Sequence, residues 1–179
     1  AEAEKGMLRL TRWRGGKAEA VEVKLPALGA YSATAPYDCP KSKRIYDLGV
    51  ASLAQRMSEA NYGKGMHGIV RGCNALALLA SGNKEWMPLV QREAKWAADF
   101  TDSGYRSWSY GYVMMFLAEY VMATGDESVL PGLTRLALET ARGQSAVGTW
   151  GHRFSTTGVN LEGYGAMNAP GLSLTIGMV

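Results

Sequence analysis

The residues Ala-Ser-Gly-Asn at 80–83 recur as Ala-Thr-Gly-Asp at 123–126, and Pro88 and Pro131 follow the two copies at the same distance. The copies lie 43 residues apart. Glycine accepts the positive φ that ends many helices, and an Asn or Asp side chain caps the helix that follows. Proline is tolerated in the first turn of a helix, where its missing N–H would have no partner. These stretches predict two copies of a helical hairpin.

Apolar residues with helical spacing surround both turns. In each predicted hairpin the first helix is apolar on nearly all sides, and the second has one apolar and one polar face. This asymmetry predicts an inner layer of buried helices and an outer layer with a solvent-facing side. We expect six helices, near residues 43–60, 66–81, 85–101, 108–124 and 128–143 and from Tyr164 to residue 179.

Glycine is in excess, at 22 of 179 residues, against a usual share of about 7%. Several glycines fall within the predicted inner helices, among them Gly68, Gly72, Gly111 and Gly171. Because glycine has no side chain, it lets two backbones approach closely. We therefore expect the inner helices to pack tightly against one another.

The N-terminal residues alternate in period two instead. Leu8 and Leu10 alternate with polar residues, as do Val21 and Val23, and the pair at 15–16 is Gly-Gly. This pattern predicts a β-hairpin with a tight turn. Two strands alone are marginally stable in water, so we expect residues 1–25 to be the end of a larger β-domain. Residues 26–41 contain three prolines and predict a linker.

Paired inner and outer helices with a period in the forties resemble the α/α toroid of terpenoid cyclases, prenyltransferases and six-hairpin glycosidases. The segment from Gln144 to Gly148-Thr149-Trp150 is similar to the end of the Gln-Trp repeat of squalene-type cyclases. The N-terminal hairpin resembles the closing strands of a bacterial PDZ domain. An open solenoid of the HEAT type is the alternative architecture, because its period is also about 40–47 residues.

Residues 33–42, between the hairpin and the helices, complete the resemblance to a bacterial family of unknown function that couples a PDZ domain to a prenyltransferase-like toroid. The resemblance implies PDZ-like strands at 1–25, a linker at 26–41 and a partial toroid at 42–179. This last range holds about three hairpins of 43 residues, so we expect a mainly α fold and an incomplete ring. The family brings no established catalytic residues.

Polar residues on the predicted inner helices are candidate ligand contacts. His67, Arg71 and Asn74 follow the i, i+4, i+7 spacing of one helix face, and Tyr110 is the repeat counterpart of His67. Tyr164 and Asn168 show the same four-residue spacing in the sixth helix. The alternative is that these side chains bond to neighbouring loops and helix ends, since buried polar groups are generally satisfied.

Trp150, His152 and Arg153 lie in a predicted loop between helices. Loops on a rigid scaffold often carry function, but this loop is equally suited to holding two repeats together. Asp99 and Asp102 could act as a carboxylate pair, yet Asp99 falls on the polar face of its helix. We therefore expect no catalytic role for that pair.

Charge and cysteine content narrow the function. The chain has 19 basic and 16 acidic residues without a basic block, which argues against a nucleic-acid partner. Its longest apolar run is too short to span a membrane. Cys39 and Cys73 lack metal-site spacing, so we expect no metal and no cofactor, and we expect Cys73 to be buried in its helix. The first five residues do not follow the order of a signal peptide, and we expect a removed leader or a longer protein.

These observations leave two functions open. The first is a non-catalytic binding or scaffold module of an exported, PDZ-linked helical-repeat protein, with a protein, peptide or glycan as partner. The second is part of a toroid enzyme that acts on a glycan or an isoprenoid-like substrate. The resemblance implies a periplasmic or secreted location. Uncovered helix faces predict that the chain self-associates.

Overall fold

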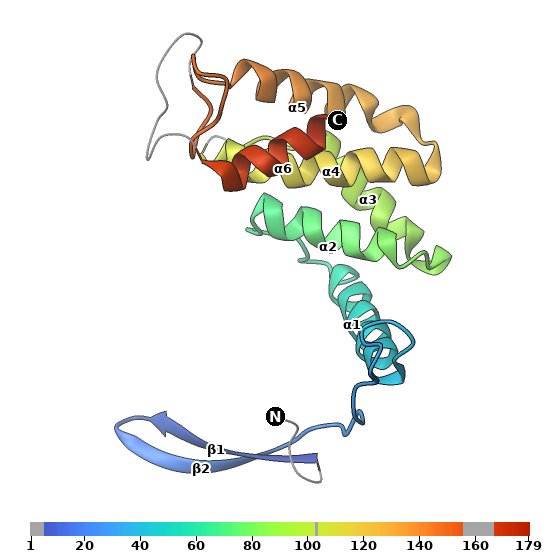
Figure 1. Cartoon of the computed structure of the whole chain (residues 1–179), viewed down its shortest axis with the longest axis vertical. Helices are drawn as coiled ribbons and strands as arrows, with labels where there is room; N and C mark the ends of the chain where they lie inside the picture. The colour runs from blue at the N-terminus through green and yellow to red at the C-terminus, as the bar shows by residue number, and fades with distance from the viewer. Residues whose placement is uncertain (1–5, 103, 156–166) are drawn as a thin grey trace. The chain divides into compact units, whose positions relative to one another are not determined.

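The computed structural model describes residues 6–102, 104–155 and 167–179. The chain divides into two compact units, residues 1–49 and 50–179. The described part is mainly helical, and its strands form a single hairpin (Figure 1). The sequence-based expectation of a helical chain with a short N-terminal β-hairpin is confirmed.

The first unit contains strands β1 (Met7–Arg14) and β2 (Lys17–Lys24), which pair antiparallel. Gly15 and Gly16 connect them with φ of 58° and 77°, the two positive values that a type I′ turn requires. Helix α1 (Pro40–Met57) begins in this unit. It starts three residues before the expected position, because proline fits the first turn of a helix.

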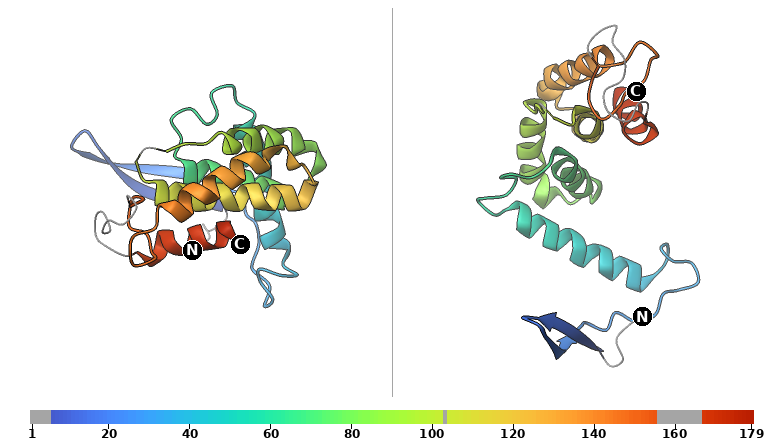
Figure 2. Two further views of the ribbon diagram at one scale, coloured as in Figure 1. Left: turned by 90° about the horizontal axis from the view of Figure 1, so that it is seen from above. Right: turned by 90° about the vertical axis from the view of Figure 1, so that its left-hand side faces the viewer.

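The second unit consists of two helical layers (Figure 2). The inner layer contains α2 (Gly68–Ala80), α4 (Arg106–Thr124) and α6 (Asn168–Met178), with α4 packed between the other two. The outer layer contains α3 (Met87–Ala98) and α5 (Leu130–Arg142). Short 3₁₀ turns, η2 (Lys84–Trp86) and η3 (Glu127–Val129), precede the outer helices.

The inner helices run parallel and touch through glycine. Gly68 and Gly72 of α2 face Ser109 and Tyr112 of α4, so both helices advance in the same direction. Gly111 of α4 lies against α6, where an added Cβ would stand 2.6 Å from the backbone of that helix. The predicted close packing of the inner layer is confirmed, and all inner helices begin at the same end of the unit.

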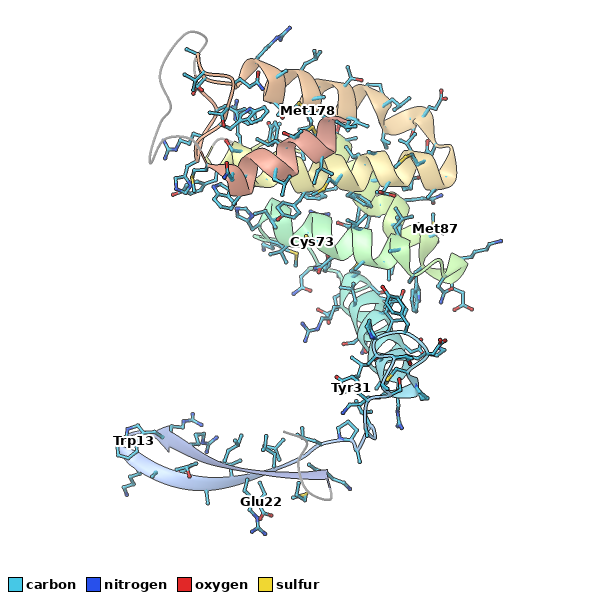
Figure 3. All side chains as sticks on the ribbon, in the orientation of Figure 1. Trp13, Glu22, Tyr31, Cys73, Met87 and Met178 are labelled. Atoms are coloured by element: carbon cyan, nitrogen blue, oxygen red, sulfur yellow. The ribbon has the colours of Figure 1, made fainter. Side chains whose placement is uncertain are left out.

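Helix α4 is buried on nearly all sides, but α2 is not. On α2, Val70 is 49% exposed and Cys73 is also exposed (Figure 3). The prediction that Cys73 lies in the core is wrong, because it lies on a side of α2 that its packing against α3 and α4 leaves open. The largest side chains that are fully buried in the unit are Met57, Leu78, Tyr110, Met114, Phe116, Leu117, Tyr120, Leu136 and Leu174.

Both hairpin turns form as the repeat predicts. Gly82 and Gly125 have φ of 66° and 69°. The side chain of Asn83 accepts a hydrogen bond of 3.0 Å from the Glu85 N–H, and Asp126 accepts one of 3.0 Å from the Ser128 N–H. The positive φ of the glycine and the capping of the 3₁₀ turn that follows are therefore the same in the two hairpins, although the C-cap of the inner helix is Ser81 in the first and Gly125 in the second.

The repeat also includes α1. Arg92 of α3 donates to the Met57 carbonyl at the end of α1, at 2.6 Å, and Arg135 of α5 donates to the Phe100 carbonyl just beyond α3, at 2.7 Å. Both the arginines and the carbonyls lie 43 residues apart. The second half of α1 is thus an outer helix in register with α3 and α5.

The spacing of 43 residues ends after α5. Helix α6 begins at Asn168, and Tyr164, where we expected its start, lies outside the described residues. The preceding turn folds back on α5, because Ser155 N–H donates to the Gly143 carbonyl and the Trp150 indole N–H donates to the Thr140 carbonyl.

The hairpin turns provide a first test of the repeat. Changing Gly82 or Gly125 to valine should each lower the free energy of unfolding by about 1 kcal/mol, because a β-branched residue tolerates positive φ poorly. No atom lies within 4 Å of a Cβ added at either site, so crowding does not contribute. Urea unfolding measures the loss, and Gly125→Asn is the control that should retain most of the stability. Full stability of both valine variants would contradict the assigned turns.

The second hairpin turn provides a pH test. The Tyr120 hydroxyl donates to Asp126 at 2.6 Å, and burial followed by this bond raises the pKa of Tyr120 to about 12. Hydrogen bonds from Ser128, then Tyr120, lower the pKa of Asp126 below its ordinary 3.8. A lowered carboxyl pKa stabilises the fold above 3.8, and this contribution is lost as the pH falls through the native pKa.

Asp126→Asn keeps a capping oxygen and removes the charge. We expect it to be less stable than the wild type near neutral pH, with the difference closing below about pH 4. Urea unfolding across this range measures the difference. Asn83→Asp, which adds a charge at the equivalent capping position of the first hairpin, is the reciprocal control. If the difference in unfolding free energy between Asp126→Asn and the wild type stays constant down to the lowest pH measured, the charge of Asp126 is not its cause.

Candidate functional site

The three polar candidates of α2 each form a hydrogen bond within the protein. His67 precedes the helix as its N-cap, and its Nδ1 accepts a hydrogen bond from the Ile69 N–H at 3.3 Å. Arg71 turns toward α3, whereas the Asn74 amide donates to the Tyr62 hydroxyl at 3.1 Å. Arg71 and Asn74 both lie beside Tyr62, and a ligand-binding face shared by all three side chains stays a prediction.

Arg71 is part of a buried ionic cluster. Its guanidinium pairs with Glu93, whose side chain is fully buried, and lies 4.1 Å from the centre of the Trp96 ring. Arg92 contacts the other carboxylate oxygen of Glu93 at 2.8 Å. A buried carboxylate needs such partners, because the interior solvates charge poorly. The cluster joins α2 to α3 and is structural.

Tyr110 and Trp150 are also part of the core. Burial of Tyr110 argues against its assignment as a ligand contact, whereas Trp150 lines a hollow at the start of α6 and its assignment stays a prediction. Tyr110 is 1% exposed and donates to Glu139 at 2.7 Å. Burial, then the bond to Glu139, raises the pKa of Tyr110. Burial acts to raise the pKa of Glu139, but the bonds from Tyr110 and Arg135 outweigh it and lower that pKa. Trp150 is 5% exposed, and its indole caps the end of α5.

His152 and Arg153 lie beside the start of α4. The Trp108 indole N–H donates to His152 Nδ1 at 2.9 Å, so a neutral His152 carries its proton on Nε2. The rings of His152 and Tyr105 meet edge to face at 5.8 Å, and the Arg153 guanidinium is 6.0 Å from the Tyr105 ring centre. Tyr105 is 51% exposed. This cluster presents an aromatic ring and a cation to solvent.

A hollow of about 430 Å³ lies at the start of α6, beside the turn that holds His152. Thr149 and Asn168 contribute polar groups to it, and Gly171 and Leu172 contribute backbone and apolar surface. We call this hollow and the Tyr105 cluster together the rim surface, defined by Tyr105, Trp108, Thr149, His152, Arg153 and Asn168. Of the predicted ligand contacts, His152, Arg153 and Asn168 lie on it, and Tyr164 lies outside the described residues.

Tyr105 and Trp108 were not predicted as site residues from the sequence. The repeat contains the signal that would have found Tyr105, because Tyr62 precedes it by 43 residues, and Glu59 precedes Asp102 by the same interval. Trp108 has glycine as its counterpart, Gly65, so the repeat gives no indication of it.

The other chemical candidates have local partners or stand apart. Asp102 accepts hydrogen bonds from the Ser109 hydroxyl at 2.8 Å and the Gly104 N–H at 2.7 Å, while Asp99 is exposed. Within the described ranges, no three side chains of the metal-binding types come together. None of the described helices has the length and apolarity that crossing a membrane requires.

A family model described as a domain of unknown function, DUF6288, matches residues 42–179. The chain belongs to this family. No curated protein and no solved structure matches the chain. The family match covers the helical region and assigns no activity to it. The matched range begins after the β-hairpin.

The buried cluster around Glu93 can be tested against the second hairpin, where Met114 and Leu136 occupy the positions of Arg71 and Glu93. Arg71→Met should lower the free energy of unfolding by about 3 kcal/mol, because it leaves a buried carboxylate without one partner. The double change Arg71→Met, Glu93→Leu copies the apolar pair and should recover most of this loss. Arg142→Met, at an exposed site, is the control. A double variant that is no more stable than Arg71→Met would contradict this account.

Proposed function

We propose that this chain is a non-catalytic binding module that holds a glycan on its rim surface. The proposal includes the architecture that the sequence resembles, a sector of an α/α toroid that follows a PDZ-like β-hairpin in an exported bacterial protein. Parallel inner helices, with an outer helix after α2 and another after α4, support the toroid. The PDZ assignment and the exported location depend on the resemblance alone.

The observation that carries the proposal is the half-exposed ring of Tyr105, with His152 edge to face beside it and the Arg153 guanidinium 6.0 Å from its centre. A half-exposed tyrosine offers a flat apolar face for a sugar ring, and sites of this kind combine aromatic walls with a few polar groups. Arg153 provides hydrogen-bonding groups beside Tyr105. Thr149 and Asn168 provide polar groups in the hollow at the start of α6. Trp108 and His152 bond to each other and fix the Tyr105 side of the surface in place.

The use of the carboxylates favours binding over catalysis. Glycoside hydrolysis generally needs two carboxyl groups that face the substrate. In the described part of the chain, Glu93 is buried between two arginines, and Glu139 binds Tyr110 and Arg135. Asp102 accepts two local hydrogen bonds. These groups hold the fold together rather than face a bound sugar.

Glycan binding can be measured by screening neutral and acidic oligosaccharides on an array, followed by titration calorimetry of those that bind. Tyr105→Ala should weaken binding at least about tenfold, because central aromatic contacts carry a large share of binding energy. Tyr37→Ala removes another exposed tyrosine, 78% exposed and far away in sequence, and should bind as the wild type does. Peptide binding with no glycan binding, or full affinity in Tyr105→Ala, would overturn the proposal.

A further inference from the structure

A second surface at the same end of the unit repeats the Tyr105 site. Tyr62 precedes Tyr105 by 43 residues, and each tyrosine lies in the loop before an inner helix. Because α2 and α4 run parallel, with Gly68 facing Ser109, both loops lie at the same rim. Tyr62 also lies near arginines, with Arg92 and Arg71 at 5.5 and 5.9 Å from its ring centre.

The surface at Tyr62 is a hollow with hydrogen-bonding groups that remain available to a ligand. It has a volume of about 610 Å³, and Tyr62 and Asn74 line it together with apolar Val70. The Tyr62 oxygen accepts the bond from the Asn74 amide, which leaves the phenol hydrogen to donate to a ligand. The Asn74 side-chain oxygen accepts no bond from any described residue, so it can accept one from a ligand. The hollow therefore offers both a donor and an acceptor.

Two cations give this hollow its charge. Arg56 and Lys64 line it, and neither forms an ion pair with a residue in the described ranges. Glu59 is the one acidic residue of the lining, so positive charge predominates. Arg153 adds a cation beside Tyr105. Both surfaces thus combine a tyrosine with positive charge, which suits a ligand that carries regularly spaced anionic groups.

We propose that the hollow at Tyr62 is a second subsite and that the ligand is an extended, carboxylate-bearing glycan that lies along the rim across both repeats. Neighbouring packed helices are about 8–10 Å apart, so one chain of a few sugar units reaches from one loop to the next. Tyr62, Asn74, Arg56 and Lys64 hold one part of the chain, and Tyr105 and Arg153 hold another. This inference builds on the proposed function and adds the charge and length of the ligand.

The test is how affinity depends on ligand length, with oligomers of galacturonic acid of two to eight units as probes. We expect the longest to bind at least about tenfold more tightly than the dimer, because the second subsite is engaged within one complex. Neutral cello-oligomers of the same lengths should bind more weakly. Affinities are measured by titration calorimetry on the full chain at low and moderate salt.

Variants in the hollow at Tyr62 test whether it causes the gain in affinity with oligomer length. Arg56→Gln with Lys64→Gln should abolish the gain with length and leave dimer binding at the Tyr105 site unchanged. Tyr62→Phe keeps the ring against its arginines and should reduce the gain. The matched control is Arg142→Gln with Lys84→Gln, two exposed cations outside the hollow.

The outcomes separate the two proposals. If acidic dimers and octamers bind equally, or if the double variant keeps the full gain, the second subsite is excluded while the Tyr105 site stands. If Tyr105→Ala binds every oligomer as the wild type does, the proposed function fails. A preference for neutral oligomers, or for a poly-glutamate peptide of similar length over the glycans, also overturns the inference.

Discussion

Direct backbone contact between the inner helices is the constraint on which this architecture depends. Gly72 lies against the Tyr112 carbonyl, Gly111 against Ser173, and Gly177 against the Gly111 carbonyl, where an added Cβ would stand 3.2, 2.6 and 2.9 Å from backbone atoms. Side chains at these points would separate the helices and open the core around α4. The same contacts align the helix starts, so the loops before α2 and α4 and the first residues of α6 gather at one rim. Packing in the layer thereby determines which loops can share a ligand.

Outer helices α3 and α5 have the same backbone arrangement, but the buried side chains at one equivalent position differ in polarity. Arg92 and Arg135 occupy equivalent positions and cap the end of the preceding outer segment in the same way. The next residue is Glu93 in one hairpin and Leu136 in the other, both fully buried. The carboxylate requires Arg71 on the facing inner helix, and the leucine faces a layer where Met114 takes that place. Polar and apolar cores are therefore alternative solutions for one backbone arrangement, which explains why Arg71 by itself does not indicate a ligand site.

The sequence predicts this fold where local chemistry determines it. Glycine at positive φ followed by a capping Asn or Asp specifies the hairpin turns, and both formed as expected. Helix α1 was not recognised as a repeat member, because Gly49 stands where Arg92 and Arg135 stand in the other outer helices. Burial was harder to predict. Cys73 is exposed and Tyr110 buried although both lie on inner helices, since burial depends on which neighbours pack on each side.

The candidate site likewise combines residues that the sequence predicts with residues that only the packing reveals. His152 and Arg153 were identifiable as polar residues in a loop between helices, and Asn168 from its helical spacing to Tyr164. Tyr105 became evident only because its ring lies beside His152. The residues after α5 depart from the spacing of 43 and bring Thr149, His152 and Arg153 to the rim. A change there leaves the glycine contacts of the inner layer intact. Recognition can therefore vary in the rim loops while the helices retain their packing, which is the usual relation between a rigid scaffold and its functional loops.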